Sequence, residues 1–211
     1  MILAGILIKL GSYGFIRFGL PVLPEGAELI TPLVFTLGVV GIIYASLSTI
    51  RQTDMKRIIA YSSVGHMGVV MLGLFSGSVL GVSGSIFMQV GHGVVSSGLF
   101  MLVTMLYERY HTRLVKYYRG MVTTMPVYIA ILFIFSLANM GTPLTSNFVG
   151  EITRLMAAYQ ISPLTGILGS LGMILSAAYG LFMYNRIAYG AVSKYMPAMP
   201  TDANRDITRR E

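Results

Sequence analysis

The stretch NMGTPLTSNFVGEITR, Asn139–Arg154, places two glycines, a proline and a carboxylate inside a sequence that otherwise suits a lipid bilayer. The apolar run Val127–Ala138 precedes it and Leu155–Ile161 follows it. A helix interrupted at membrane depth is tolerated only where its freed backbone groups face protein or water. Gly141 and Pro143 therefore predict a break that lines a cavity, as in transporters that hold ions at discontinuous helices.

Glu151 follows this break, and an ionisable residue at membrane depth is a functional candidate by default. The alternative is a plain loop between two short helices, in which Glu151 pairs with Arg154 one turn later. The stretch by itself leaves both interpretations open.

Composition indicates an integral membrane protein. Hydrophobic residues make up 55% of the 211 residues and charged residues only 11%, whereas a soluble domain has about 25% charged residues. At about 20 residues per span, the chain has room for seven or eight helices with short loops. This excludes a soluble catalytic domain. The first residues also lack the pattern of a cleaved signal peptide.

Two further properties exclude classes of function. The sequence contains no cysteine, which excludes disulfides, thiolate metal sites and iron–sulfur ligation within this chain. The net charge is +7, but the basic residues lie between hydrophobic spans rather than along a soluble face, so they do not indicate nucleic-acid binding. We expect lipid around this chain and no metal or cofactor bound by it.

Hydropathic runs bounded by charges and turn residues predict an all-α integral membrane fold with about six transmembrane helices, one of them discontinuous. The predicted spans are Ile2–Leu20, Leu29–Ile50, Ile58–Phe75, Val79–Tyr107, the discontinuous Met121–Gln160, and Pro163–Tyr189. Residues 1–190 then form the transmembrane region, and residues 191–211 form a polar tail on the inner face.

The basic residues favour a single interrupted crossing in Met121–Gln160. With one crossing per span, Arg17 alone lies on one side of the membrane. The other side receives Arg51, Lys56, Arg57, Arg109, Arg113, Lys116, Arg119, Arg186, Lys194, Arg205, Arg209 and Arg210. The positive-inside rule makes this the cytoplasmic or matrix face. Two crossings within Met121–Gln160 would move the basic residues from Arg186 onward to the opposite face.

Few polar residues lie inside the predicted spans. Lys9 lies in the apolar run ILIKLG, where a cation needs a partner or a water-filled cavity. Alternatively, its side chain extends to the membrane interface near the start of the chain. His66 lies one turn after Ser62, and His92 shares a helix face with Gln89. Histidines at this depth suit proton transfer, although a packed histidine satisfied by a neighbour is the commoner arrangement.

The segment Glu108–Arg119, ERYHTRLVKYYR, favours an interfacial stretch with its tyrosines at the level of the lipid head groups. Its His111 is expected to be exposed rather than functional.

Five motifs occur in order along the chain, namely LAGILIKLGSYGFIRF, QTDMKRIIAYSSVGHMG, GHGVVSSGLF, LYERYHTR and GTPLTSNFVGE. With them the chain resembles the C-terminal half of NADH dehydrogenase subunit 4, in the antiporter-like proton-pumping family of respiratory complex I. The resemblance covers nearly the whole chain. It implies an inverted-repeat, antiporter-like fold, in which this chain is similar to family helices eight to thirteen.

The resemblance also implies roles for four residues. Lys9 matches the central lysine of the family, His66 and His92 match its midplane histidines, and Glu151 matches the terminal glutamate on the second discontinuous helix. In the family, these residues carry proton transfer. FMN, iron–sulfur clusters and ubiquinone are implied in other subunits, and the implied location is the mitochondrial inner membrane or a bacterial or plastid energy-transducing membrane.

The sequence departs from the family pattern at both ends. The family's first half and its last helix have no counterpart in this sequence. We therefore expect other membrane-arm subunits as partners, and separate chains that supply the missing N-terminal helices and the last helix.

Three hypotheses follow for the function. The first is a proton-translocating subunit of NADH:ubiquinone oxidoreductase that has no redox chemistry of its own. The second is a subunit of a multi-chain cation/proton antiporter or of a membrane hydrogenase. The third is an inert scaffold of the membrane arm, which the combination of Lys9, His66, His92 and Glu151 argues against.

Overall fold

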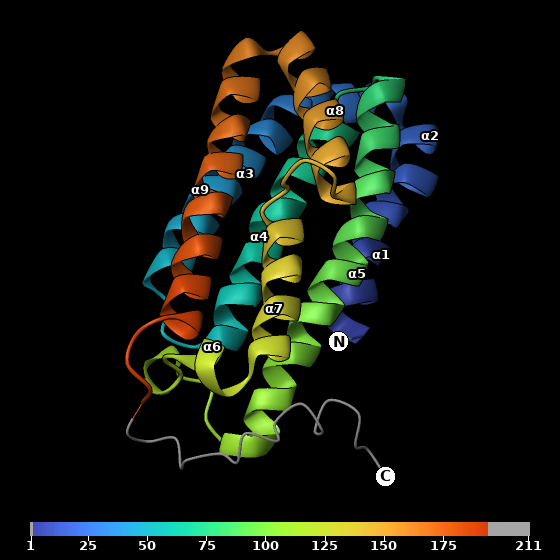
Figure 1. Cartoon of the computed structure of the whole chain (residues 1–211). Helices are drawn as coiled ribbons and strands as arrows, with labels where there is room; N and C mark the ends of the chain where they lie inside the picture. Colours follow the sequence, from blue (N-terminus) through green and yellow to red (C-terminus); the bar gives the residue numbers. More distant parts are fainter. Residues whose placement is uncertain (1, 194–211) are drawn as a thin grey trace.

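The structure is a computed structural model that describes residues 2–193, and over these residues it contains helices and loops without a strand (Figure 1). The segments are η1 (Leu3–Leu7), α1 (Ile8–Gly14), η2 (Phe15–Gly19), α2 (Leu20–Val22), α3 (Pro24–Arg51), α4 (Met55–Leu74), α5 (Val79–Tyr110), η3 (Val115–Tyr117), α6 (Met121–Thr124), α7 (Pro126–Asn139), α8 (Ser146–Ile161) and α9 (Pro163–Ala188). The all-α fold is confirmed. The predicted tail lies outside the described residues except for residues 191–193.

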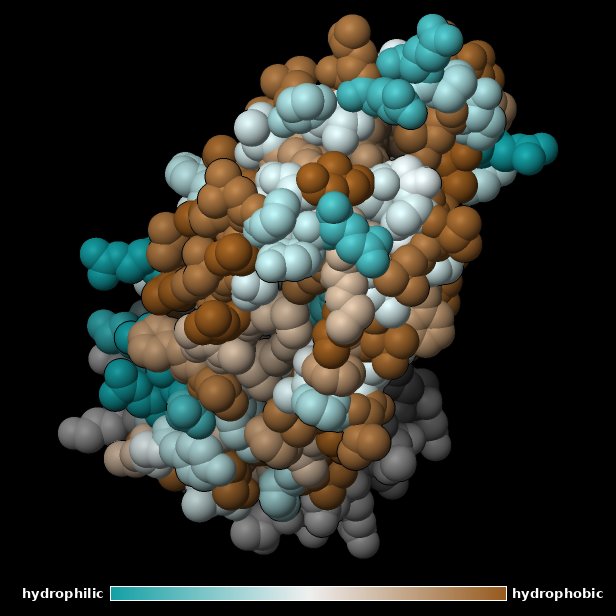
Figure 2. Space-filling view, turned by 90° about the horizontal axis from the view of Figure 1, so that it is seen from above, coloured by the Kyte–Doolittle hydropathy of each residue, from teal (hydrophilic) through white to brown (hydrophobic). Residues whose placement is uncertain are grey.

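Five helices in the described part of the chain are long and apolar enough to cross a membrane. They are Leu3–Val22, Pro24–Arg51, Met55–Leu74, Val79–Tyr110 and Pro163–Ala188. Large apolar side chains such as Leu29 and Val79 are more than four-fifths exposed. Figure 2 shows hydrophobic side chains over much of the visible face, with the hydrophilic ones in a few separate groups. This surface suits a protein that is surrounded by lipid and by other apolar helices.

The chain begins with one continuous rod, Leu3–Val22, in which two π-helical stretches flank α1. A π-helical turn holds more residues than an α-helical one, so it changes the direction of the side chains that follow. The rod packs on α5, and only 11% of its most apolar window is buried, against 61% for α4. Most of its surface therefore faces away from the rest of the chain.

Helix α4 lies at the centre of the bundle and packs against α3, α5, α8 and α9 (Figure 1). Its contact with α3 is close because Gly68 presents no side chain. A Cβ on Gly68 would lie only 2.9 Å from Ile42 and 3.0 Å from the Gly38 carbonyl oxygen. Small residues commonly permit such close approach between membrane helices.

The predicted break is confirmed in the fifth span. Helix α7 ends at Asn139 and α8 begins at Ser146. In Figure 1, α7 and α8 follow one another along a single crossing of the bundle, and α9 returns beside them. The single interrupted span therefore describes this region better than two complete crossings.

Three connections meet at the end of the bundle where the basic residues gather. The α3–α4 loop pairs with the segment after α5, through bonds from the Met55 amide to the Arg113 carbonyl (3.0 Å) and from the Val115 amide to the Thr53 carbonyl (2.9 Å). The Gly120 amide donates to the carbonyl oxygen of Tyr189, just past α9 (3.3 Å). These contacts place the ends of α3, α5 and α9 together, as the distribution of basic residues predicts.

Two expectations from the sequence need correction. The second span begins at Pro24 rather than Leu29, because proline suits the first turn of a helix and Glu25 complements the helix dipole there. In the stretch Glu108–Arg119, the first three residues belong to α5 and the rest forms a connection with one short helical turn, η3, and not all of its tyrosines point outward. Within it Tyr118 is fully buried and donates to the Thr112 carbonyl (2.8 Å), and this burial raises the pKa of Tyr118 to about 12. His111 is exposed as expected.

Candidate functional site

Four helices bring the predicted site residues together in the interior of the bundle. Lys9 comes from α1, His92 from α5, His66 from α4 and Glu151 from α8. The exposed fractions of His92, His66 and Glu151 are 1%, 5% and 3%, whereas Lys9 is half-buried. His66, His92 and Glu151 lie well inside their helices, and Lys9 is the second residue of α1, within the continuous rod Leu3–Val22.

Lys9 points toward His92. Its Nζ lies 3.0 Å from His92 Nδ1, and it also donates to the carbonyl oxygen of Ala4. One turn along α1, the Ser12 hydroxyl donates to Gln89 Oε1 (2.7 Å), which ties the same two helices. Of the two interpretations of Lys9, the structure therefore favours a buried partner over extension to the interface.

The two histidines lie side by side. Their ring centroids are 5.1 Å apart, and the ring planes are inclined by 57°. The Nε2 atoms of both rings are buried and have no hydrogen-bond partner. Two adjacent imidazoles with unused nitrogens can exchange a proton through one bridging water.

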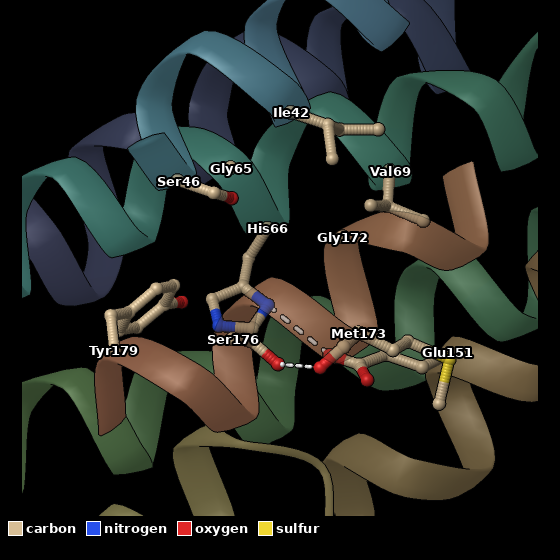
Figure 3. Close-up of a pocket in the computed structure, with 10 residues that line it drawn as sticks. All are labelled: Ile42, Ser46, Gly65, His66, Val69, Glu151, Gly172, Met173, Ser176 and Tyr179. Carbon is tan, nitrogen blue, oxygen red and sulfur yellow. Dashed lines mark hydrogen bonds and ion pairs between the residues drawn. The ribbon is translucent and has the colours of Figure 1, made fainter. Parts of the chain in front are cut away.

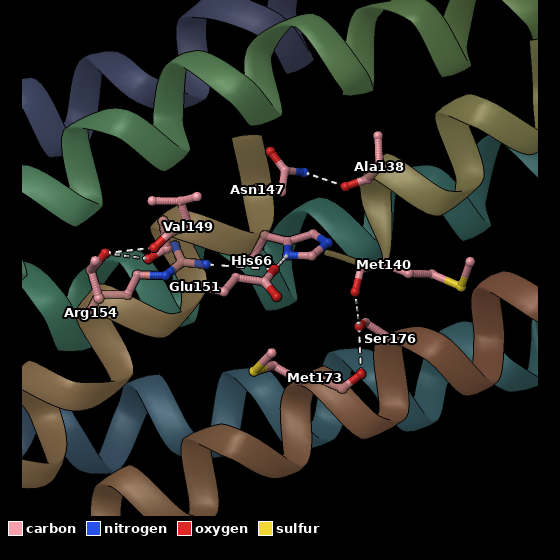
Figure 4. A network of polar contacts seen from close by, with 11 residues as sticks. His66, Ala138, Met140, Asn147, Val149, Glu151, Arg154, Met173 and Ser176 are labelled. Atoms are coloured by element: carbon pink, nitrogen blue, oxygen red, sulfur yellow. Dashed lines mark hydrogen bonds and ion pairs between the residues drawn. The ribbon is translucent and has the colours of Figure 1, made fainter. Parts of the chain in front are cut away.

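His66 connects this pair to Glu151. Its Nδ1 lies 3.2 Å from Glu151 Oε1, and Figure 4 shows the imidazole turned toward the carboxylate. On the other side of the carboxylate, Arg154 Nη2 lies 3.7 Å from the same oxygen. Glu151 therefore makes the contacts of both interpretations. It contacts His66, another candidate site residue, and it also contacts Arg154 one turn later.

Arg154 is fully buried, and none of its three guanidinium nitrogens has a hydrogen-bond partner. An arginine keeps its charge even when buried, so it fixes a positive charge beside Glu151. Sequence reasoning named Arg154 only as the residue one turn after Glu151 that could pair with it. The i,i+3 spacing is the same for an exposed pair and a buried pair, so the sequence carried no signal for its burial.

The helix break shapes the space around Glu151. Gly141 has a φ of +68°, a conformation that suits glycine, and a Cβ at this position would overlap Glu151 Oε2. The carbonyl groups freed by the break find donors. The Asn147 amide donates to the Ala138 oxygen (2.9 Å), and the Ser176 hydroxyl lies 3.5 Å from the Met140 oxygen (Figure 4). The expectation that protein satisfies the freed backbone is confirmed for these groups.

The contacts run in the order Lys9, His92, His66, Glu151 and Arg154, from the half-buried Lys9 to the fully buried Arg154. We call these five residues the polar chain. The first four can each take up and release a proton, whereas Arg154 acts as a fixed charge. Within residues 2–193, no three His, Asp or Glu side chains gather in a way that could hold a metal ion. The geometry suits proton transfer.

Comparison with known proteins places the chain in a family. The family described as NADH:quinone oxidoreductase/Mrp antiporter, TM matches residues 1–179. NADH-ubiquinone oxidoreductase chain 4 of Metridium senile is 51% identical over 100% of this chain and 42% of its own length. The protein of the same name from Marchantia polymorpha is 51% identical over 97% of this chain and 41% of its own length. The chain thus spans about two-fifths of the length of these relatives.

Solved structures agree with this result. A chain of respiratory complex I from Thermus thermophilus superposes with a TM-score of 0.84 and 33% identity, over 95% of this chain and 43% of that one. A chain of an archaeal membrane-bound sulfane sulfur reductase superposes with a TM-score of 0.81 at 22% identity, over 93% of this chain and 41% of that one. This second likeness concerns the fold alone. The resemblance to subunit 4 is confirmed, and the chain belongs to the NADH:quinone oxidoreductase/Mrp antiporter family of membrane proteins.

Proposed function

We propose that this chain is the proton-translocating part of a membrane-arm subunit in a respiratory NADH:ubiquinone oxidoreductase. The observation that carries the proposal is the continuous order of contacts from Lys9 through His92 and His66 to Glu151. The last three side chains are more than nine-tenths buried. The names of the relatives from Metridium senile and Marchantia polymorpha support the same assignment.

Protons would move along the polar chain in short steps. The Lys9 ammonium donates a proton to His92 Nδ1, and His92 releases its Nε2 proton through a water to His66 Nε2. His66 in turn gives its Nδ1 proton to Glu151. Each imidazole receives one proton and releases one, so neither ring keeps an extra charge beside the other. Arg154 stabilises the ionised form of Glu151 before the proton arrives.

The energy for this transfer comes from outside the chain. In this proposal FMN, iron–sulfur clusters and ubiquinone belong to other subunits, where NADH is oxidised and the quinone is reduced. The chain lies in the mitochondrial inner membrane as a multi-pass protein, with the basic end of the bundle toward the matrix.

Other polypeptide segments complete the subunit. A groove of about 740 Å³ between the first rod and α5 is lined by Lys9, Gln89 and mainly apolar residues such as Leu10. We assign this groove, together with the exposed side of the first rod, to the helices that precede this part in longer relatives. Further membrane-arm subunits and lipids cover the remaining apolar surface.

The decisive experiment is Glu151→Gln in the assembled complex, reconstituted in lipid vesicles. Glutamine keeps the size of the side chain but cannot carry the proton. We expect proton transfer through this subunit to slow by on the order of 100-fold and fewer protons to be pumped per NADH oxidised, while the complex still assembles. The readouts are the proton-to-electron ratio and the amount of intact complex.

Glu28→Gln makes the same chemical change at an exposed position of α3 and serves as the control. An unchanged proton-to-electron ratio in Glu151→Gln would remove Glu151 from the pathway and favour an inert scaffold. Pumping that requires a sodium gradient rather than NADH oxidation would favour a cation/proton antiporter.

A further inference from the structure

A small cavity lies beside His66 and Glu151, outside the line of the polar chain. Its volume is about 20 Å³, and its polar lining consists of Ser46, Ser176 and Tyr179 together with His66 and Glu151 (Figure 3). A buried cavity of this size accommodates one water molecule when polar groups surround it. The lining supplies hydroxyl groups from α3 and α9, which have no part in the proposed transfer from Lys9 to Glu151.

His66 Nε2, which has no hydrogen-bond partner among the described residues, indicates such a water. His66 is 5% exposed, its Nδ1 contacts Glu151, and its Nε2 has no hydrogen-bond partner. Figure 3 shows this second nitrogen on the side of Tyr179. When Nδ1 carries the proton that faces the carboxylate, Nε2 is a bare acceptor. A buried acceptor without a donor is costly, and a water in the cavity supplies the donor.

Tyr179 also lines a second, smaller cavity of about 10 Å³. The polar groups there are Ser62, Ser136 and Asn139. The Ser62 hydroxyl donates to the Ile59 carbonyl (2.8 Å), so its hydrogen is already used. The Ser136 hydroxyl is buried without a partner. This second cavity therefore offers unused hydrogen-bonding groups on the far side of Tyr179 from His66.

The second cavity lies nearer the basic end of the bundle. Ser62 precedes His66 by one turn of α4, and α4 starts at that end with Met55. Ile58, Ile59 and Met183 also line the cavity, and all three are buried. The polar groups thus stop at an apolar layer, a kind of constriction that closes water pathways in channels.

We propose that Tyr179 links two water sites in a side branch, which leaves the polar chain at His66 and Glu151 and runs toward the basic end. The branch rests on the proposed function and adds a second entry to it. A proton passes when a hydrated proton in the second cavity gives one hydrogen to the Tyr179 oxygen. The Tyr179 hydroxyl gives its own hydrogen to the water beside His66 Nε2, and that water gives one of its hydrogens to Nε2. Tyr179 ends each step neutral. Arg154, on the other side of Glu151, keeps its charge and cannot release a proton, so it does not supply this entry.

Tyr179→Phe in the assembled, reconstituted complex tests the hydroxyl. Phenylalanine keeps the ring and removes only the oxygen. We expect the proton-to-electron ratio to fall while the complex assembles in normal amount. Tyr128→Phe is the matched control, because this hydroxyl is equally buried but donates to the Leu102 carbonyl (3.1 Å) and lines neither cavity.

Gly65→Ala tests the water site without removing any polar group. A Cβ on Gly65 would lie 3.7 Å from Ser46 Oγ, an ordinary contact across the first cavity. The methyl group occupies the space of the water and raises helix propensity. We expect fewer protons pumped per NADH in a variant at least as stable as the parent. Gly41→Ala is the control, because its Cβ would meet nothing within 4 Å.

A high-resolution map of the complex gives a readout that does not depend on pumping. We expect density for a water between His66 and Tyr179, and its loss in Gly65→Ala. An empty site in the parent complex, or normal pumping in both Tyr179→Phe and Gly65→Ala, overturns the branch. If Glu151→Gln still lowers pumping in that case, the proposed function stands without the branch. If Glu151→Gln also has no effect, the proposed function itself fails.

Discussion

Helices α7 and α8 are the two halves of one interrupted span, yet they bury different kinds of residue. Helix α7 contains no charged residue and buries Tyr128, Ile129 and Leu132 in the apolar cluster near the basic end. Helix α8 buries Glu151 and Arg154 in the polar chain. The break therefore separates a half that is held by packing from a half that carries charge. Stability and proton transfer should accordingly respond to substitutions in different halves.

The largest effect is expected in the charged half. Arg154→Met removes the fixed positive charge, so the buried Glu151 carboxylate loses its cationic partner. Removing one partner of a buried ion pair costs about 3–5 kcal/mol. The free energy of unfolding should therefore fall by that amount. Thermal unfolding of the purified complex measures it, and pumping should be lost as well.

The double variant Glu151→Gln/Arg154→Met sharpens this test. Because it removes both charges, it should be more stable than Arg154→Met alone. Equal losses in the single and the double variant would mean that the two side chains do not interact.

A smaller effect on stability, and none on pumping, is expected in the apolar half. Leu132 is 2% exposed, and Leu132→Ala leaves a cavity that should lower the free energy of unfolding by about 2–3 kcal/mol. Ile134→Ala removes a similar side chain that is 64% exposed and should change little. If Leu132→Ala lowered the proton-to-electron ratio, the proposed separation between the two halves would be wrong.

Gly141→Ala should cost less in stability, about 1–2 kcal/mol, for a non-glycine residue in the left-handed region. The added Cβ also displaces the Glu151 carboxylate, so pumping should fall more than the lost stability explains. Gly41→Ala, in an open helical position, provides the comparison. Normal pumping in Gly141→Ala would show that the position of the carboxylate tolerates movement.

The smallest expected effect concerns the bond that joins the two halves. Asn147→Ala removes the donor to the Ala138 carbonyl and should lower the free energy of unfolding by about 1 kcal/mol. A shift in the unfolding temperature measures this loss. No shift would mean that another donor replaces the Asn147 amide.

Hydropathy and the turn residues were enough to predict the spans and the break, because both follow from the need to satisfy the backbone in lipid. The same reasoning singled out Lys9, His66, His92 and Glu151 as polar residues in apolar runs. Which atoms meet depends on how each helix is rotated about its axis. For Lys9 that rotation is set partly by the π-helical stretches around it, which hydropathy does not reveal.

Other residues were missed because their sequence context is ordinary. Tyr179 lies on a helix with many small and apolar neighbours, and only the packing of α4, α7 and α9 places it between two cavities. Tyr118 was expected near the head groups because tyrosine is common there, but backbone pairing of its segment with the α3–α4 loop draws it inward.

The backbone bonds between the three connections at the basic end have a mechanical consequence. They join the α3–α4 loop to the segment after α5, and residue 120 to the end of α9. Among the described residues, the backbone bonds around the opposite connections, at Phe75–Ser78 and at Ser162, are local to one turn. Relative tilting of the helices would therefore pivot at the basic end and have its greatest amplitude at the opposite end, around Phe75–Ser78 and Ser162.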